Sequence, residues 1–315
     1  MANLKELSSV PEVLASGHRM CAGCGAPIVV RQVLRGAKAP VVVANATGCL
    51  EVSTTIYPYT SWNSPFIHTA FECAAASLSG VEAAYNSLKR QGKITEEIKF
   101  VAFGGDGGTY DIGLQSLSGA VERGHNMVYV CYDNGAYMNT GIQRSSATPK
   151  GAETTTTPVG KTQPGKTERR KDLTKIMIAH DIPYVAQVAP SHWNDLYKKS
   201  EKAFSVEGPA FINALAPCPR GWRYDAEDTI EMCRLAVDTC FWPLYEAEYG
   251  KITVTYKPRN KKPVTEFLKA QGRFRHLFSP DNEHILEEIQ AEVDRQWEEL
   301  LALERLGLES QEQQE

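Results

Sequence analysis

The segment 103–139 combines glycines with acid and amide side chains at a spacing that suits metal and phosphate binding. Glycines at positions 104, 105, 107 and 108 flank Asp106 and let backbone N–H groups approach an anion closely. Asp106 and Asn134 carry hard oxygens of the kind that Mg²⁺ prefers. Each follows an apolar run, and parallel sheets bind ligands at the carboxyl ends of their strands. The segment therefore predicts a site for a diphosphate held through a metal.

The Gly105-Asp106-Gly107 turn, followed after a helix and a strand by Asn134, resembles the thiamine diphosphate motif. In that motif the Asp and Asn side chains and a nearby backbone carbonyl bind Mg²⁺, which assigns these roles to Asp106, Asn134 and the carbonyl of Ala136. The motif usually ends in Asn-Asn, whereas this chain has Asp133-Asn134, so Asp133 is the weaker candidate. Glycine-rich turns occur in many α/β proteins, but the strand, helix, strand and Asn together favour thiamine diphosphate.

The N-terminal stretch, the lack of long apolar runs and the cysteine content together favour metal binding by thiols. The stretch MANLKELSSVPEV has no apolar core flanked by basic residues, so we expect no signal peptide. No stretch approaches the roughly 20 consecutive apolar residues of a membrane span. We therefore expect a cytoplasmic protein whose eight cysteines stay reduced, which favours metal binding over structural disulfides.

Four cysteines lie where their sulfurs could gather around a metal centre. Cys21 and Cys24 form a Cys-x-x-Cys loop, and Cys49 and Cys218 each follow an apolar run. Four thiolates are what a [4Fe–4S] cluster requires. A Cys₄ zinc site commonly uses two such loops and this chain has one, but zinc, a redox-active pair and unligated thiols stay open on spacing alone. The remaining cysteines are expected to be buried small hydrophobic residues: Cys73, Cys131, Cys233 and Cys240.

Taken together, these features resemble the β subunits of pyruvate:ferredoxin oxidoreductase and related 2-oxoacid:ferredoxin oxidoreductases. The resemblance covers most of the chain and rests on Cys21-Ala-Gly-Cys24-Gly, Ala46-Thr-Gly-Cys49, GGDGGTYDIGLQSLSGAVERGHN, Tyr137-Met-Asn-Thr-Gly-Ile-Gln-Arg-Ser145, Ala216-Pro-Cys-Pro219 and LKAQGRFRHLF. It implies that a [4Fe–4S] cluster close to thiamine diphosphate is held by Cys21, Cys24, Cys49 and Cys218.

The resemblance also implies which residues form the cofactor pocket, with Asn139 directed at the substrate as a catalytic group. The implied pocket residues are Ala26, Cys49, Gly105, Asp106, Gly107, Gly108, Asn134, Gly135, Ala136, Tyr137, Met138 and Asn139. Two positions depart from the family pattern. Gly135 stands where many pyruvate enzymes have Glu, and Cys73 stands where Asn is usual. Both departures leave the identity of the 2-oxoacid open.

Apolar runs and amphipathic stretches alternate up to about residue 215, which predicts a doubly wound α/β fold with a mostly parallel sheet. The expected strands are Ala39–Ala44, Ile98–Phe103, Met127–Tyr132, Ile182–Val188 and Ala210–Leu215. The expected helices are Ala70–Arg90, Asp111–Arg123, Leu173–His180 and Trp193–Phe204. We predict a thiamine diphosphate-binding domain over residues 1–220 and a partly helical extension with subunit contacts over residues 221–315.

Three segments outside that pattern have more than one interpretation. Loop 145–170 is dense in Thr, Gly, Pro and Lys, which fits a mobile surface loop or a strap over the cofactor or a neighbouring subunit. The basic stretch 257–263 fits a solvated loop or a contact with an acidic ferredoxin. After a helix near Ala226–Val237 and a strand over Lys251–Tyr256, a helical stripe runs from Pro280 to Leu306, and a frayed polar tail is expected from Leu308.

The resemblance implies the catalytic subunit of an enzyme that decarboxylates pyruvate oxidatively, with coenzyme A as acyl acceptor and ferredoxin as electron acceptor. Alternatives are a sibling enzyme acting on oxalate or another 2-oxoacid, and a zinc- and thiamine-binding regulatory or assembly subunit without redox chemistry. The expected partners are the alpha and gamma subunits, with delta as a further candidate. A formal charge of −4 of mixed sign argues against nucleic acid.

Overall fold

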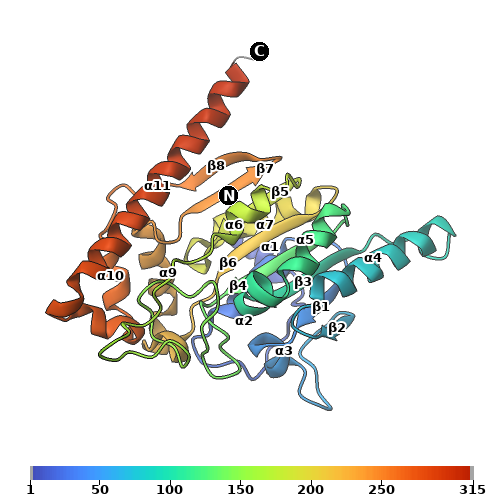
Figure 1. Cartoon of the computed structure of the whole chain (residues 1–315). Helices are drawn as coiled ribbons and strands as arrows, with labels where there is room; N and C mark the ends of the chain where they lie inside the picture. Colours follow the sequence, from blue (N-terminus) through green and yellow to red (C-terminus); the bar gives the residue numbers. More distant parts are fainter. Residues whose placement is uncertain (1–2, 313–315) are drawn as a thin grey trace.

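The computed structural model describes residues 3–312 and is built around one eight-stranded sheet with helices on both faces (Figure 1). The strand order is β2-β1-β3-β4-β6-β5-β7-β8. The first six strands in this order are parallel, and β7 and β8 join as an antiparallel edge. The strands are β1 (Val41–Ala46), β2 (Phe66–Thr69), β3 (Lys99–Gly105), β4 (Val128–Asp133), β5 (Tyr184–Val188), β6 (Ala210–Leu215), β7 (Leu244–Glu248) and β8 (Lys251–Tyr256).

The direction of winding reverses between β1 and β3. From β1 the chain crosses to β2 at one edge of the sheet, and from β3 it continues to β4 on the other side. Ligands of doubly wound sheets bind at such a switch point, beyond the carboxyl ends of the strands. The segments that leave β1 and β3 there are Thr47-Gly48-Cys49 and Asp106-Gly107-Gly108, so the topology places both predicted motifs at one position.

Two layers of helices bury the central strands from both sides, which explains why these strands read as continuous apolar runs. On one face α2 (Gly25–Arg35) and α7 (Trp193–Ser205) pack on side chains such as Val101 and Phe103. The other face is covered by α4 (Ala74–Arg90), α5 (Leu114–Glu122), α6 (Leu173–Ile178), α9 (Thr229–Asp238), α10 (Val264–Lys269) and α11 (Glu283–Glu312). Short helices α1 (Leu4–Ser9), α3 (Cys49–Thr54) and α8 (Pro219–Trp222) lie in the connections.

The structure confirms the doubly wound fold, and each predicted strand and helix up to β6 is present with ends shifted by a few residues. The expected helix Asp111–Arg123 begins later, because a π-helical turn (Gly107–Ile112) comes before α5. Helix α2 and the strands β2 and β7 were not predicted. Strand β2 has only four residues and is half exposed, so it lacks the long apolar run by which the other strands were recognised.

The part after residue 220 continues the same sheet and core. Strands β7 and β8 extend the sheet beyond β5, and apolar residues of α9, α10 and α11 belong to the core cluster that also contains α4 and α5. In α11 the predicted stripe is buried from Ile285 to Leu300. The frayed tail expected from Leu308 is wrong for residues 308–312, because the helix continues to Glu312, and residues 313–315 lie outside the described part. The division at residue 220 stays a prediction.

The basic stretch 257–263 packs against acidic groups of its own chain. Lys257 Nζ lies 2.6 Å from Glu304 Oε2, Lys261 pairs with Asp294, and both acids are on α11. Lys262 lies 3.7 Å from Asp238. These lysines are therefore occupied within the subunit, which weakens the idea of a free basic surface for ferredoxin. Among residues 3–312, no helix combines the length and the apolarity that a membrane crossing would need.

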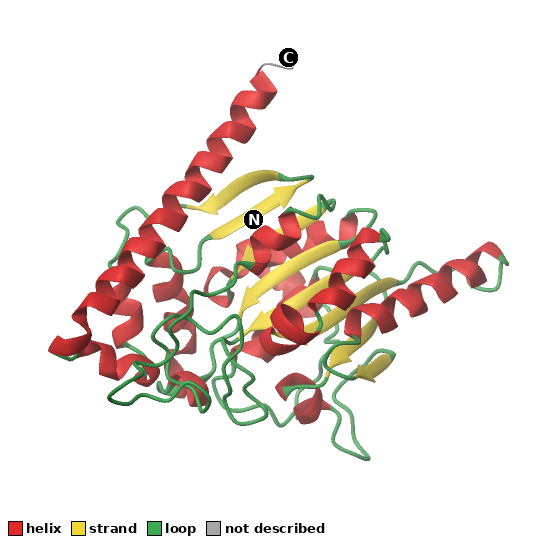
Figure 2. Cartoon of the chain, in the orientation of Figure 1, coloured by secondary structure: helices red, strands yellow, loops and turns green. Residues whose placement is uncertain are grey.

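Loop 145–170 is packed rather than free along much of its length. Figure 2 shows it among the loops gathered below the sheet, beside α10 and α11. Ser145 and Thr148 are fully buried, and Lys166 is 1% exposed although it carries a charge. The Lys166 ammonium donates to the carbonyl oxygen of Thr148 at 2.6 Å and to three further loop carbonyls at 3.4 Å. This contact holds the two ends of the loop together near β4.

Candidate functional site

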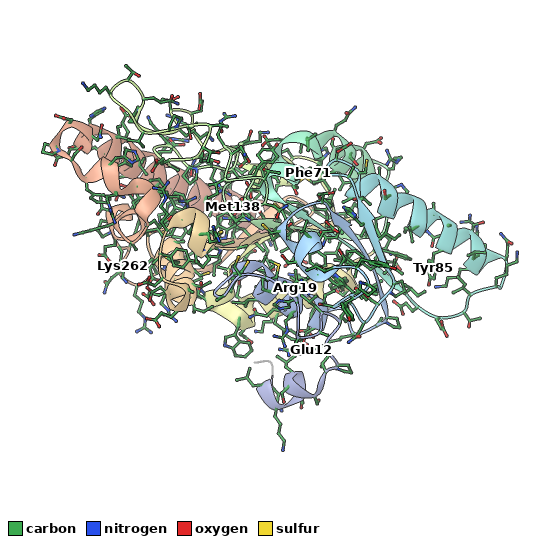
Figure 3. All side chains as sticks on the ribbon, turned by 90° about the horizontal axis from the view of Figure 1, so that it is seen from below. Glu12, Arg19, Phe71, Tyr85, Met138 and Lys262 are labelled. Carbon is green, nitrogen blue, oxygen red and sulfur yellow. The ribbon has the colours of Figure 1, made fainter. Side chains whose placement is uncertain are left out.

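The segments that leave β1, β3 and β4 form one cleft with about 310 Å³ of empty space. We call it the glycine-rich cleft. It is lined by Thr47, Gly48, Cys49, Phe71, Gly105, Gly107, Gly108, Tyr132, Asn134, Ala136, Tyr137, Met138, Asn139 and Thr140. Two of these residues, Phe71 and Met138, are labelled near the middle of Figure 3, which views the molecule from below. Most residues implied to bind the cofactor therefore share one cavity.

Three oxygen-bearing groups converge at the base of this cleft. One position of the Asn134 terminal amide lies 2.9 Å from Asp106 Oδ1 and 2.9 Å from the Ala136 carbonyl oxygen. If the amide nitrogen occupies this position, it donates hydrogen bonds to Asp106 Oδ1 and to the Ala136 carbonyl oxygen. If the amide oxygen occupies it, this oxygen faces the other two oxygens. Oxygens bound at 2.0–2.1 Å on adjacent corners of an Mg²⁺ octahedron are about 2.9 Å apart. The Asn134 amide therefore lies at this spacing from both Asp106 Oδ1 and the Ala136 carbonyl oxygen.

Asp106 is fully buried and already oriented by two donors. Its Oδ2 accepts a hydrogen bond from Ser145 Oγ at 2.5 Å, and its Oδ1 accepts one from the backbone N–H of Asn134 at 3.2 Å. Burial and, after it, the nearby Asp133 carboxylate raise the pKa of Asp106 well above its usual value. A cation at this position would stabilise the ionised form, since a metal is the largest local charge in such a site.

Asp133, which the sequence analysis named as the weaker candidate for a metal ligand, belongs to a buried network of hydrogen bonds. Its carboxylate accepts from Arg170 Nη2 at 2.5 Å and from the backbone N–H of Gly135 at 3.0 Å. Arg170 also donates to the Tyr110 hydroxyl at 2.6 Å and to the Ala147 carbonyl at 2.9 Å. Burial is the largest single effect and lowers the pKa of Arg170, but the charge of Asp133, its hydrogen bond and the smaller effects of Tyr110 and Asp106 together outweigh it, and the net shift is upward. Asp133 thus fixes the turn that carries Asn134.

Glycine is required at two points of the cleft wall. A Cβ atom on Gly107 would lie 2.4 Å from the ring of Tyr137, so any side chain there would displace the loop that carries Asn134 and Tyr137. Gly135 has φ = +75°, a left-handed conformation that residues with a Cβ adopt only with strain. The Gly135 position therefore suits the tight turn between Asn134 and Ala136, whatever the substrate.

None of the four predicted cluster cysteines forms a disulfide, and a backbone hydrogen bond from Gly25 to the carbonyl of Pro217 at 3.0 Å joins the loop of Cys24 to that of Cys218. Burial, and then the charges of Cys218, Cys49 and Cys21, raise the pKa of Cys24 to about 12. Burial, followed by Cys218 and Cys21, raises the pKa of Cys49 to about 12. Such thiols ionise only if a positive centre compensates the charge, which is what a metal group supplies.

Two further observations describe the spread of these four sulfurs. Within the described part of the chain, no group of three or more His, Cys, Asp or Glu side chains converges on the position of a single ion. Their mutual charge effects nevertheless place the four sulfurs in one neighbourhood. Cys131, Cys233 and Cys240 are buried elsewhere, and Cys73 is half-buried just before α4.

Cys49 belongs both to the glycine-rich cleft, which it lines, and to the group of four cysteines, because its pKa is influenced by the charges of Cys21 and Cys218. A second contact joins the two sets. A Cβ on Gly221 would meet Met138 Sδ at 2.3 Å and Cys218 Sγ at 3.5 Å, so Met138 packs against the loop of Cys218. The cleft and the cysteine group are therefore adjacent.

Some implied residues lie outside the cleft lining, and some lining residues were missed. The backbone N–H of Ala26 faces the Cys24 sulfur, and Asp106 and Gly135 do not line the cleft, although their neighbours in the chain do. Sequence reasoning gave no role to Thr47, Gly48, Phe71, Tyr132, Thr140 or the buried Ser145.

Thr47 in particular is held firmly at the cleft. Its hydroxyl is 2.7 Å from His68 Nε2 and 3.0 Å from the Thr69 carbonyl, and His68 Nε2 lies 3.5 Å from the buried Glu51. The position of Thr47 directly before Gly48-Cys49 was the available signal, because that whole turn leaves β1 at the switch point.

Comparison with known families defines the class of protein. Residues 46–214 match the family described as thiamine pyrophosphate enzyme, C-terminal TPP binding domain. The match runs from the end of β1 to β6 and includes Cys49, Asp106 and Asn134. The fold is also similar to that of a 2-oxoglutarate:ferredoxin oxidoreductase from Magnetococcus marinus, with a TM-score of 0.54, 20% identity and coverage of 88% of this chain and 92% of that chain.

Curated relatives define the family more closely. The chain is 56% identical over 299 residues to pyruvate synthase subunit PorB of Thermotoga maritima, covering 93% of this chain and 92% of the relative. It is 57% identical to the PorB subunit of Methanocaldococcus jannaschii over 87% of this chain and 93% of that one. It is 44% identical to ketoisovalerate oxidoreductase subunit VorB of Pyrococcus abyssi, covering 91% of this chain and 92% of that one. The chain belongs to the β-subunit family of the 2-oxoacid:ferredoxin oxidoreductases.

The Arg170–Asp133 pair can be tested by Arg170→Met, which keeps an apolar stem and removes the charge. Because the substitution leaves the Asp133 carboxylate buried without its partner, the free energy of unfolding should fall by about 3–5 kcal/mol. Denaturant unfolding followed by circular dichroism measures this loss. The neighbouring Arg169→Met, whose side chain is 70% exposed, is the matched control and should change stability far less. Equal stabilities of the two variants would contradict the role of the pair.

Proposed function

We propose that this chain is the catalytic β subunit of a coenzyme A-acylating pyruvate:ferredoxin oxidoreductase. In this proposal the glycine-rich cleft holds the diphosphate and thiazolium of thiamine diphosphate, with Mg²⁺ on Asp106, Asn134 and the Ala136 carbonyl. A [4Fe–4S] cluster is bound by Cys21, Cys24, Cys49 and Cys218. The observation that carries the proposal is the double position of Cys49, which lines the cleft and is grouped with the other three thiols.

The metal part of the proposal is supported by the three converging oxygens and by the buried, donor-oriented Asp106. When bound, thiamine diphosphate supplies a nucleophilic carbon for the ketone and an electron sink for decarboxylation, and the cluster accepts single electrons. The chain's own part is to bind and orient. Gly107 lets the ring of Tyr137 pack directly on the backbone of the glycine-rich turn, and Phe71 and Tyr137 pack edge to face with ring centroids 6.0 Å apart at the cleft wall.

The cluster is preferred to zinc because relatives of this chain are named as subunits of a pyruvate synthase and of a ketoisovalerate oxidoreductase. Oxidation of a substrate requires an electron acceptor, and zinc has no redox chemistry to offer one. A zinc- and thiamine-binding module without redox chemistry is therefore the less supported alternative.

The substrate and partners are proposed from the relatives. Relatives named pyruvate synthase reach 57% identity, and the relative named for ketoisovalerate is 44% identical, so pyruvate is the substrate we propose. Coenzyme A and ferredoxin are the proposed acceptors of the acyl group and the electrons. Other subunits of the complex, including alpha and gamma, are the proposed partners. The eight free cysteines fit a reducing cytoplasm, which we propose as the location.

The metal assignment predicts that Asp106→Ala abolishes Mg²⁺-dependent binding of thiamine diphosphate, because the charged ligand facing the diphosphate is lost. Isothermal titration calorimetry on the purified complex measures this affinity, and iron content is determined on the same sample. Glu122→Ala, an exposed carboxylate at the end of α5, is the control and should bind the cofactor normally. Unchanged affinity in the Asp106 variant would show that the metal is held elsewhere.

The cluster assignment predicts a brown protein with about four iron per chain after anaerobic purification. Single Ser substitutions at Cys21, Cys24, Cys49 and Cys218 should each lower the iron content and stop reduction of ferredoxin. The same change at Cys73, Cys131, Cys233 and Cys240 should keep the iron. Cys49→Ser should in addition disturb thiamine binding. A colourless protein that contains zinc would refute the redox assignment.

The substrate assignment predicts a role for Asn139, which is exposed at the mouth of the cleft and can donate without adding charge. Asn139→Ala should lower kcat with pyruvate on the order of 10²-fold, the scale seen when one donor to a developing oxyanion is lost. The affinity for thiamine diphosphate should change little. Steady-state kinetics of the complex with pyruvate, oxalate, 2-oxoglutarate and branched 2-oxoacids compares the variant with wild type. Asn260→Ala, an exposed asparagine outside the cleft, serves as the control.

Normal turnover of the Asn139 variant with its best substrate would show that Asn139 is structural. The same panel of substrates decides between pyruvate and a sibling 2-oxoacid, because the native substrate should have the highest kcat/KM in the wild-type complex.

A further inference from the structure

Arg273 is a buried cation in the short helical segment Gly272–Phe278, and it has no role in the site as described so far. It is 3% exposed. Its guanidinium lies 4.2 Å from the centre of the Trp222 ring, and its Nε donates to Gln271 Oε1 at 2.9 Å. None of the ion pairs found among residues 3–312 includes Arg273. A buried guanidinium held in this way needs a negative partner to offset its desolvation.

The surroundings of Arg273 join the two halves of the proposed site. Trp222, on which the guanidinium stacks, donates from Nε1 to the carbonyl oxygen of Asn134 at 2.6 Å. Trp222 ends α8, whose first turn is capped by Cys218 Sγ, which accepts from the backbone N–H of Gly221 at 3.3 Å. On its other side Arg273 Nη1 lies 3.1 Å from the point that a Cβ on Gly135 would occupy. Arg273 therefore stands between the loop of Cys218 and the loop that carries Asn134.

Position identifies the partner. Trp222, on which the guanidinium stacks, ends the helical turn that begins after Cys218, so Cys218 is the proposed cluster ligand that belongs to this turn. Burial lowers the pKa of Arg273 to about 9, so the guanidinium is still protonated at neutral pH. Asp133 is already paired with Arg170, so it is not free to act as the main counter-ion of Arg273.

We propose that Arg273 is a positioning residue that favours electron uptake by the iron–sulfur group on Cys218 and holds the Cys218 loop against the metal-binding loop. The inference rests on the proposed function, which supplies the cluster and the electron. Reduction adds one electron and one negative charge to the cluster. A fixed, desolvated cation nearby stabilises this reduced state more than the oxidised one, since its interaction is weakly screened in a buried site.

The experiment compares Arg273→Gln, Arg273→Lys and the control Arg275→Gln in the anaerobically purified complex. Arg275 is exposed and lies on the same helical segment, so its substitution removes a charge without touching Trp222. A redox titration followed by electron paramagnetic resonance measures the reduction potential of the cluster, and iron and thiamine diphosphate are quantified in each sample. Arg273→Gln should lower the equilibrium constant for one-electron reduction about tenfold, which is about 59 mV toward more negative potential. The reduction potential of Arg273→Lys should lie close to that of the wild type, and the potential of Arg275→Gln should equal it.

The outcomes separate this inference from the proposed function. Wild-type protein without iron overturns the proposed function and the inference with it. Iron-loaded Arg273→Gln protein with wild-type potential overturns the inference alone. If Arg273→Gln loses the cluster, the Arg273→Lys variant decides. Full iron with a wild-type potential supports a role of the charge. Full iron with a potential about 59 mV more negative refutes it.

Discussion

The site depends on keeping one carboxylate, Asp106, fully buried at the switch point of the sheet. A buried carboxylate is costly unless donors and a cation compensate it. The donors are present in Ser145 and the backbone N–H of Asn134, and the place for a cation is marked by the Asn134 amide and the Ala136 carbonyl. Much of the nearby structure serves this arrangement: the Arg170–Asp133 pair fixes the turn, and Lys166 ties together the loop that delivers Ser145.

A second constraint is the short separation between cleft and cysteines. Cys49 begins α3 directly after β1, so the same turn that borders the cleft also presents a thiol to Cys21, Cys24 and Cys218. If the proposed cofactor and cluster were bound, Cys49 would hold the cluster beside the cleft, at the place where single electrons would have to be accepted. The family match includes Cys49 but not Cys21, Cys24 or Cys218, so Cys49 is the one member of the cysteine group that belongs to the matched part of the chain.

The sequence predicted the strands well because the central ones are buried on both faces and so consist of unbroken apolar residues. It missed β2 and β7, which are short and lie toward the edges of the sheet, and it ended α11 too early because polar residues continue that helix beyond the apolar stripe. Among site residues, glycines, Asp106 and Asn134 were recognisable by spacing. Ser145 and Phe71 were not, because each reaches the site through contacts between segments far apart in the chain, and Thr47 was overlooked although it directly precedes Gly48-Cys49.

By itself, the sequence determined the order of the elements and singled out the Gly-Asp-Gly turn and four cysteines as candidates, since these depend on local spacing and on which residues must be buried. Only the tertiary structure decided that Asp133 pairs with Arg170, that loop 145–170 is packed around Lys166, and that the lysines of 257–263 pair with acids of their own chain. It also decided that Arg273 lies between the two cofactor loops. Each of these is a contact between charges distant in sequence, and such pairings are fixed by the three-dimensional path of the chain, on which composition and periodicity carry no information.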